Sequence, residues 1–325
     1  MRKPMHISRI TLRHIDFADD TYSLLPPCCT EEIPSSLIDS IKRYGILHPP
    51  IVKEKSAASF VIVAGGKRLR IAMEQCAGVT CDCIKLTEKT SEAETLGLCL
   101  EERLLGKPLS PVERATFFLK ALQWLDEKQL AENHLPLMHL SPSVYLIQRD
   151  LKLLELEEPL VIAVHEQHLE EKVAFELSKL SFSDRMALFE IINCLRLSVG
   201  NQKKLLITCR ELAARKSITI RELLSGTEAA AILNHPEANV PQKTANLMKW
   251  LSSQRFPRFS EAEKNFHQFT AGLALPIEAR LEHSLSFEKN ELLLTLSCAD
   301  RPHFTQIWER IKDLFPADPA KEPRP

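Results

Sequence analysis

Short apolar runs alternate with helix-forming segments through the first third of the chain. Four of these runs are bounded by turn-forming residues and predict β-strands: Ile7–Leu12, Ile51–Lys53, Phe60–Ala64 and Cys81–Leu86. Before the second run, Pro34 suits a first helical turn and Gly45 suits the position after a last one, with apolar residues at helical spacing between them. The alternation predicts a mixed α+β domain over residues 1–105.

The apolar spacing then becomes helical throughout residues 106–225. This segment opens with Ser110, Pro111 and Glu113, which form a capping box with proline at the first helical position. Ser181 marks the start of a later helix in the same way. We therefore predict an all-helical middle domain.

The C-terminal part has a third pattern. Glycine and proline residues favour a linker over 226–245, and a small α+β domain is expected over 246–315. Its first helix is predicted to be capped by Ser260 and Glu263. The later elements are a hairpin of Ala279–Phe287 and Leu292–Cys298 about the turn Glu288–Glu291, a helix over Pro302–Phe315 and a disordered tail over 316–325.

Composition limits the classes of function. A chain of 325 residues is too long for one typical core. A net charge of −1 supplies no long-range field for nucleic acid, so any contact with DNA must come from a local patch. Nine cysteines without paired Cys-x-x-Cys spacing predict reduced thiols. No apolar run approaches the ~20 residues that span a bilayer, and we see no signal peptide, so we expect a cytoplasmic protein without membrane partners.

A turn at Gly65 and Gly66 carries the most specific chemistry. An apolar β-branched run stops there, and a helix-forming segment opens at once with Lys67, Arg68 and Arg70. A glycine turn that leads into a helix N-terminus presents backbone N–H groups to an anion. Cations in a first helical turn oppose the preference of the helix dipole, which favours an anionic ligand at this place.

Three motifs in this order resemble the ParB partition-protein family. They are Gly-Ile-Leu-His-Pro-Pro-Ile-Val at 45–52, Gly-Gly-Lys-Arg-Leu-Arg-Ile-Ala at 65–72 and Leu-Ser-Pro-Val-Glu-Arg-Ala at 109–115. The resemblance covers roughly residues 5–160 and implies a ParB/sulfiredoxin-like N-terminal fold, then a divergent helix-turn-helix domain. Sulfiredoxin chemistry is excluded, because Lys67 stands where the reactive cysteine belongs and an ammonium cannot replace a thiolate.

By position, the resemblance implies a pocket for CTP. Its phosphates fall to Gly65, Gly66, Lys67, Arg68 and Arg70, and its cytidine side falls to Gly45, His48 and Pro49. The family's Glu-Asn-x-Gln-Arg box falls at 102–106, where only Glu102 is retained as a group for phosphate and Mg²⁺, and Arg103 supplies a charge of its own. We predict CTP with Mg²⁺ as the ligand, and we name no catalytic residue.

The middle domain contains segments that resemble a helix-turn-helix. Lys128–Asn133 is the supporting helix, and residues 141–154 are the recognition helix, capped by Ser141. The expected DNA contacts are Ser141, Ser143, Tyr145, Gln148, Arg149 and Lys152. The connection over 135–140 is longer and more apolar than a usual turn, and Asp150 adds a negative charge, so a purely structural helix pair is the alternative.

Together these features predict a ParB-like, DNA-binding homodimer of the nucleoid. Its expected role is chromosome or plasmid partition or related transcriptional regulation, with a ParA-type ATPase as partner. A ParB-fold interaction adaptor that binds neither DNA nor nucleotide is the alternative, favoured by the near-neutral charge and the incomplete 102–106 box. A nuclease would need clustered carboxylates to hold metal ions, and near the glycine turn the sequence offers only Glu101 and Glu102.

Overall fold

The computed structural model describes residues 6–30, 32–56, 59–75, 80–284, 287 and 291–314. The chain folds as two compact units, Met1–Leu206 and Ile207–Pro325, here called unit 1 and unit 2. Within the described residues, every helix is too short or too polar to cross a lipid bilayer.

Unit 1 begins with a five-stranded sheet in the order β1-β5-β3-β4-β2. The strands are β1 (His6–Thr11), β2 (Ile15–Asp16), β3 (Ile51–Ser56), β4 (Ser59–Ala64) and β5 (Thr80–Leu86), with a 3₁₀ helix η1 (Leu12–His14) between the first two. The sheet is mixed, because β3–β5 and β2–β4 pair in parallel and β1–β5 and β3–β4 in antiparallel fashion. The four predicted strands are confirmed, and the sheet has a further strand, β2, which is only two residues long.

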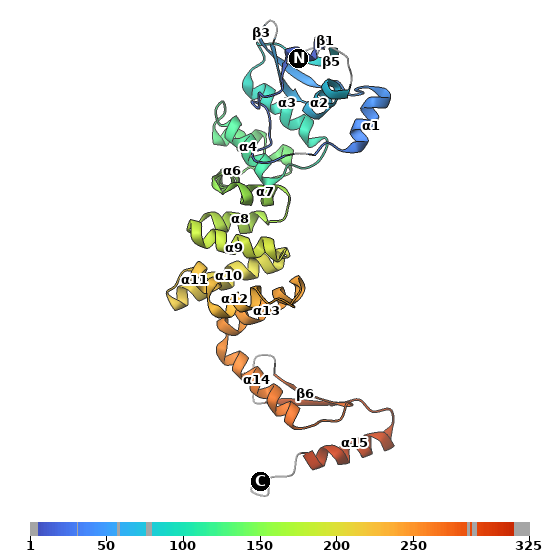
Figure 1. Ribbon diagram of the computed structural model, residues 1–325, viewed down its shortest axis with the longest axis vertical. Helices are drawn as coiled ribbons and strands as arrows, with labels where there is room; N and C mark the ends of the chain where they lie inside the picture. Colours follow the sequence, from blue (N-terminus) through green and yellow to red (C-terminus); the bar gives the residue numbers. More distant parts are fainter. Residues whose placement is uncertain are drawn as a thin grey trace. The chain divides into compact units, whose positions relative to one another are not determined.

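Helices cover both faces of this sheet, because β4 has apolar side chains on both of its faces. The helices of this region are α1 (Ser35–Tyr44), α2 (Gly66–Gln75) and α3 (Glu92–Leu104), drawn around the sheet in Figure 1. Phe60 belongs to the core that includes Leu69 of α2, whereas Val61 and Val63 belong to the core that includes Leu100 of α3. Successive side chains of β4 point to opposite faces of the sheet, so alternate residues pack into the two different cores. Gly45 follows the end of α1, as predicted, and its φ is 73°.

The next helices of unit 1 follow one another in chain order in Figure 1. They are α4 (Pro111–Ala121), α5 (Glu127–Asn133), α6 (Val144–Leu151), α7 (Glu158–His165), α8 (Glu171–Ser178) and α9 (Phe182–Cys194), with 3₁₀ helices η2 (Pro136–Met138) and η3 (Lys152–Glu155). The predicted capping box of α4 is present. One core cluster contains Leu100 of α3 together with Phe117 and Phe118 of α4. The hydrophobic core is therefore continuous across residue 105, where a domain boundary was expected.

The helix-turn-helix differs from its expected form at the second helix. The supporting helix matches α5, but the recognition helix α6 begins at Val144 with Ser143 as its N-cap, so the prediction that Ser141 caps it was wrong. The side chain of Ser143 makes no capping hydrogen bond. The apolar connection before it folds as η2 and ends at His139, which has a positive φ. Leu135 of this connection is fully buried, which explains its apolar sequence.

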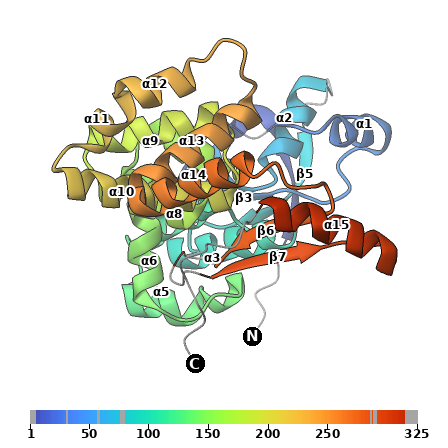
Figure 2. The same ribbon diagram turned by 90° about the horizontal axis from the view of Figure 1, so that it is seen from below.

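Unit 2 is helical before it reaches a hairpin. Its elements are the end of α10 (Val199–Lys216), α11 (Ile220–Ser225), α12 (Thr227–Leu233), α13 (Val240–Arg255), α14 (Pro257–Gly272), β6 (Ala279–His283), β7 (Leu292–Leu296) and α15 (Arg301–Leu314). Figure 2 shows β6 and β7 side by side. The predicted hairpin and last helix are confirmed, but the turn residues 288–290 and the tail 316–325 lie outside the described residues.

Two predictions for unit 2 were wrong. The expected linker over 226–245 holds all of α12 and the start of α13, because Ala229 is fully buried and the Trp250 indole donates to Glu228 at 2.8 Å. Glycine at 226 caps this short helix instead of starting a flexible segment. The helix α14 starts at Pro257 behind Phe256, and not at the predicted cap Ser260.

Candidate functional site

The glycine turn lies where the sequence analysis placed it, between β4 and α2. Gly65 has a φ of 82°, a left-handed value that side-chain-bearing residues rarely adopt. Gly66 is the first residue of α2, so the N–H groups of the first helical turn follow directly. This backbone geometry is suited to an anionic group.

The side chain of Arg68 lies across this turn. Its Nη1 donates to the backbone oxygen of His48 at 2.5 Å, and its Nη2 donates to Oε1 of Glu102 at 3.0 Å. A Cβ atom at Gly65 would come within 2.8 Å of Nη2, so the glycine is what allows Arg68 to pack here. The neighbouring Lys67 donates to the backbone oxygen of Glu32 at 2.7 Å. Arg68 therefore connects the three segments that the resemblance assigned to CTP, which contain His48, the glycine turn and Glu102.

A cavity of about 1150 Å³ opens in front of the turn. Its wall contains eight of the nine residues predicted for nucleotide binding: His48, Pro49, Gly65, Gly66, Lys67, Arg68, Arg70 and Glu102. Gly45, the ninth, is exposed and does not line the cavity. The volume is slightly above the usual range of small-molecule sites, about 300–1000 Å³, and a cationic turn at one side gives the cavity a polarity suited to a phosphorylated ligand.

The cavity also has walls beyond the nine residues predicted for nucleotide binding. Arg103 of α3 and Glu113 of α4 line it, and they pair with each other at 2.5 Å. A turn from Pro26, closed by the Cys29 N–H at 2.9 Å, contributes another side. Burial raises the pKa of the Cys29 thiol to about 12, so this cysteine is a protonated, unreactive wall group. The capping motif of α4 was visible in the sequence, but its contact with the cavity depends on packing.

The carboxylates nearest the turn do not offer an open metal site. Glu102 is bound to Arg68, and Glu113 is bound to Arg103 and accepts the Ser110 N–H at 2.8 Å in the capping box. Among the described residues, no group of three or more His, Cys, Asp or Glu side chains is arranged to hold a metal ion. The donor set therefore fits an anion better than it fits Mg²⁺.

The residues predicted to contact DNA are divided between exposed and occupied side chains. Ser141 and Tyr145 are exposed. Gln148 donates to Glu127 at 3.1 Å, and Lys152 pairs with Glu155 at 2.8 Å. These surface bonds contribute little to stability, so both side chains can exchange their partners for phosphate oxygens.

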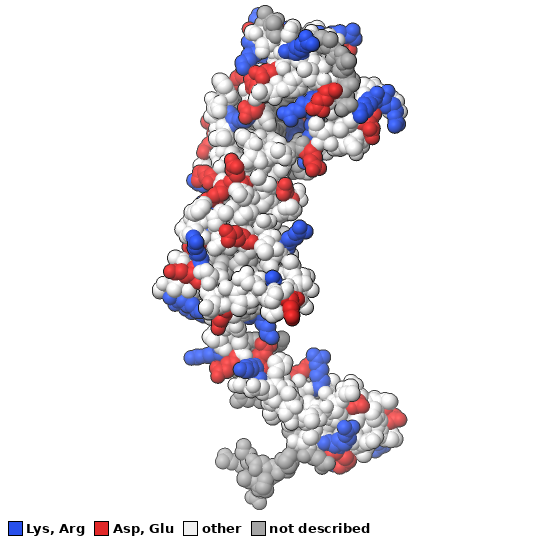
Figure 3. Space-filling view, in the orientation of Figure 1, with Lys and Arg blue, Asp and Glu red and all other residues white. Residues whose placement is uncertain are grey.

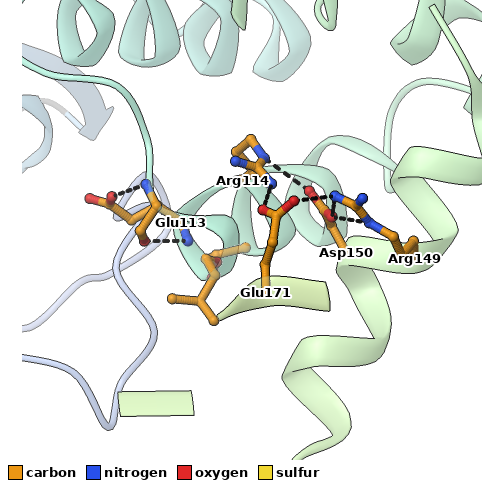
Figure 4. Close-up of polar contacts among 8 residues, drawn as sticks. Glu113, Arg114, Arg149, Asp150 and Glu171 are labelled. Atoms are coloured by element: carbon orange, nitrogen blue, oxygen red, sulfur yellow. Dashed lines mark hydrogen bonds and ion pairs between the residues drawn. The ribbon is translucent and has the colours of Figure 1, made fainter. Parts of the chain in front are cut away.

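Arg149 is held much more firmly, in a closed ring of four charged side chains. Asp150 accepts Arg114 at 2.9 Å and Arg149 at 2.8 Å, and Glu171 accepts the same two guanidiniums at 2.9 and 3.2 Å. Figure 4 shows this ring between α4, α6 and α8. We call Arg114, Arg149, Asp150 and Glu171 the charge quartet.

Burial gives the quartet its strength. The Asp150 side chain is 1% exposed and that of Arg149 only 15%. Burial acts to raise the pKa of Glu171, but the hydrogen bond and charge of Arg114 outweigh it, so the pKa lies below its usual value. Burial likewise acts to lower the pKa of Arg114, but the charge of Asp150 outweighs it. The quartet pairs two guanidiniums with two carboxylates, so Arg149 has no charge left over for DNA in this arrangement.

The distribution of charge on the surface is as mixed as the near-neutral net charge of the chain suggests. Figure 3 shows acidic and basic side chains interspersed over the coloured part of unit 1 on the face drawn. A DNA-binding face on this side would have to be small and local.

The comparisons with known proteins concern the sequence and the fold of unit 1. The family model of the ParB N-terminal domain matches residues 6–98, which include the sheet, the glycine turn and the start of α3. Residues 6–98 are similar to the ParB N-terminal domain. The predicted resemblance and the mixed α+β class are thereby confirmed.

The similarity to curated relatives extends beyond the ParB N-terminal domain. Two proteins from Neisseria meningitidis, of serogroups A and B, are each described as a probable chromosome-partitioning protein ParB. Each is 28% identical to this chain over 215 residues. The match covers 66% of this chain and 64% of each relative.

Two solved structures of Caulobacter crescentus ParB are also similar, both C-terminally truncated. One is complexed to the centromeric parS site, with a TM-score of 0.35 over 61% of this chain and 98% of that chain. The other is complexed with CTP-γ-S, with a TM-score of 0.24 over 57% and 98%. Both are 17% identical to this chain. Similarities this low say nothing about the ligands of this chain.

Proposed function

We propose that the ParB N-terminal domain of this chain binds CTP in the cavity at the glycine turn. The observation that carries the proposal is the convergence of Gly65, Arg68 and His48 on one wall, with Arg68 bridging the turn to α3. Phosphates would lie against the α2 N-terminus and its cations, and the base would lie toward His48 and Pro49. CTP is the first nucleotide to test, because the motifs at 45–52 and 65–72 resemble those that the ParB partition-protein family uses to hold CTP.

Replacing Arg68 with alanine is expected to weaken CTP binding about tenfold or more, because a charge-assisted contact to phosphate is lost. Isothermal titration calorimetry of the full chain with CTP measures the effect. Arg9→Ala is the matched control, since Arg9 is exposed, pairs only with Asp82 in the described residues and lies outside the cavity. Equal affinities of wild type and Arg68→Ala would place the ligand elsewhere.

We further propose that the chain binds DNA and acts in chromosome or plasmid partition or related transcriptional regulation. Support comes from the curated relatives and from α6, whose exposed Tyr145 and loosely held Gln148 surround a buried Ile147, and from the exposed Lys152 at the start of η3. Arg149 enters this proposal only if DNA displaces it from the charge quartet. A ParA-type ATPase and association with the nucleoid belong to the same proposal.

Unit 2 supports the proposed homodimer. Among the described residues, the sheet of β6 and β7 has just two strands, and Leu292 and Leu293 are more than half exposed. A two-stranded sheet with apolar side chains in solvent is marginal alone and gains from a second copy.

Titration of DNA fragments at rising salt tests the DNA proposal. A steep fall of the binding constant is expected, with a logarithmic slope of about −0.9 for each phosphate contacted. Lys152→Gln should make the slope shallower by about one such unit. Sedimentation in the same titration tests the stoichiometry, and two chains per complex are expected. Absence of binding at low salt would contradict the proposal.

A specific observation favours a second function, that of an interaction adaptor with the ParB fold. Arg149 is neutralised inside the charge quartet, and the six expected DNA-contacting positions then carry Lys152 as their one remaining cation, itself paired with Glu155. In that case DNA binding would be absent at every salt concentration.

A further inference from the structure

We infer that Lys53 is a positioning residue for the proposed nucleotide site, and that it acts through Glu92 and Tyr22 to hold the wall segment 17–30 against the nucleoside. The inference rests on the proposed function and deepens it, because it assigns a part of the cavity to the nucleoside and not to the phosphates. Lys53 lies outside the described wall of this cavity, so its effect passes through Tyr22, which is part of that wall.

The segment 17–30 is an irregular part of the cavity wall. It follows β2 and contains neither helix nor strand, so no backbone ladder fixes its position. It contributes apolar side chains such as Phe17 and Leu24, and its charged contributions are the carboxylates of Asp19 and Asp20. Apolar groups suit a nucleoside, and carboxylates repel phosphates. This wall therefore fits the part of the ligand that lies beyond the α2 N-terminus.

Tyr22 anchors the segment to the rest of unit 1. The residue is 5% exposed, and its hydroxyl donates to Oε2 of Glu92 at the start of α3. The other oxygen of this carboxylate, Oε1, accepts the Lys53 ammonium at 2.6 Å. The same ammonium lies 5.7 Å from the centroid of the Tyr22 ring. Each of the three side chains therefore contacts the other two.

The ionisation states suit this arrangement. Burial and the hydrogen bond to Glu92 raise the pKa of Tyr22, so its hydroxyl is protonated and donates. Burial acts to raise the pKa of Glu92, but the hydrogen bonds from Lys53 and Tyr22 outweigh it, so the pKa lies below its usual value. The carboxylate is thus an ionised acceptor for both donors.

Burial indicates what the ion pair contributes. The Lys53 side chain is 7% exposed, and a buried ion pair stabilises a fold little more than an apolar pair of the same size. Its contribution is direction: apolar packing is non-directional, whereas a carboxylate fixed by Lys53 accepts the Tyr22 hydroxyl in one orientation. The ion pair of Lys55 with Asp19 of the same segment is a surface contact, because Lys55 is 58% exposed. We therefore expect the buried pair to set the position of the wall.

Cys99 of α3 reports the position of Tyr22. Its thiol lines the cavity and donates to the backbone oxygen of Tyr22 at 3.1 Å, and the residue is 6% exposed. Burial raises the pKa of this thiol to about 12, so it reacts slowly with an alkylating reagent while Tyr22 covers it. The rate of alkylation of Cys99 therefore measures the position of the segment without any ligand.

Calorimetry of the full chain with CTP compares the wild type with Lys53→Met, which removes the ammonium and keeps the length of the side chain. The affinity is expected to fall about tenfold, because Glu92 then turns toward solvent and Tyr22 loses its acceptor. Adding Glu92→Gln to Lys53→Met should restore the affinity to within about threefold of the wild type, since a neutral amide oxygen still accepts the Tyr22 hydroxyl.

Iodoacetamide labelling of Cys99, followed by mass spectrometry, is the second measurement on the same chains. Labelling should be about tenfold faster in Lys53→Met than in the wild type, because the wall moves away from the thiol. The double variant should return toward the wild-type rate. Lys89→Met is the matched control, since Lys89 is exposed and lies outside the cavity. Thermal melting identifies a loss of fold, and Tyr22→Phe, which keeps the ion pair and the ring, should show the same two effects where Lys53→Met does not fold.

The outcomes separate this inference from the proposed function. A wild-type chain that binds no CTP contradicts the proposed function and the inference together. Unchanged CTP affinity in Lys53→Met overturns the inference alone and leaves the CTP site standing. A loss of affinity that Glu92→Gln does not restore, or one without faster labelling of Cys99, also overturns it, because the lysine would then act by a route other than the Tyr22 wall.

Discussion

Replacing Asp150 with alanine is expected to lower the free energy of unfolding of unit 1 by about 3–5 kcal/mol, the usual cost of breaking a buried ion pair from one side. The substitution removes a carboxylate that is 1% exposed and binds both Arg114 and Arg149. Two guanidiniums would then share Glu171 alone. Because the quartet joins α4, α6 and α8, the loss should affect the unit as a whole.

Urea unfolding followed by tryptophan fluorescence measures the effect. Trp124 belongs to unit 1, so Trp250 and Trp308 of unit 2 are first replaced with phenylalanine. Asp39→Ala is the matched control, since Asp39 is exposed on α1, and its change should stay within about 0.5 kcal/mol. A loss below about 1 kcal/mol for Asp150→Ala would show that the quartet is a solvated surface network.

Local chemistry explains which parts of the fold could be predicted from the sequence. Short apolar runs bounded by turn-forming residues predicted the strands around Val61, and proline and glycine at the ends predicted α1. The capping box at Ser110 gave the start of α4. Each of these signals depends on a few neighbouring residues. The linker over 226–245 failed for the opposite reason, since the helix there depends on burial of Ala229, which composition does not reveal.

The candidate site was predictable to the same extent. The glycine turn and its cations are adjacent in sequence, and the structure gathers eight of the nine expected residues on one wall. Glu113 and the turn at Pro26 were not assigned to the cavity, because they reach it only through packing between distant segments. The pairing of Arg149 was likewise hidden, since Glu171 lies on a helix 22 positions away. A sequence motif identifies a charged residue such as Arg149, but the residues that pair with it depend on the fold.

Replacing Gly65 with alanine is expected to lower the affinity for CTP about 100-fold, through two losses of about tenfold each. The φ of 82° would become strained by about 1–2 kcal/mol, so the backbone would shift and the N–H groups of the α2 N-terminus would turn away. The new Cβ would also meet the Arg68 guanidinium at 2.8 Å and displace it from His48 and Glu102. The turn and its principal cation would be lost together.

Calorimetry with CTP measures the loss, and the adjacent glycine provides the control. A Cβ at Gly66 would lie 3.6 Å from Cγ2 of Ile62, an ordinary contact, and no positive φ is involved. Gly66→Ala should therefore bind CTP within about threefold of the wild type and gain slightly in helix propensity. If Gly65→Ala binds as tightly as Gly66→Ala, the positive-φ turn is not the phosphate site. If both variants lose binding equally, the added methyl groups block the cavity sterically, and the backbone geometry at Gly65 is not the cause of the loss.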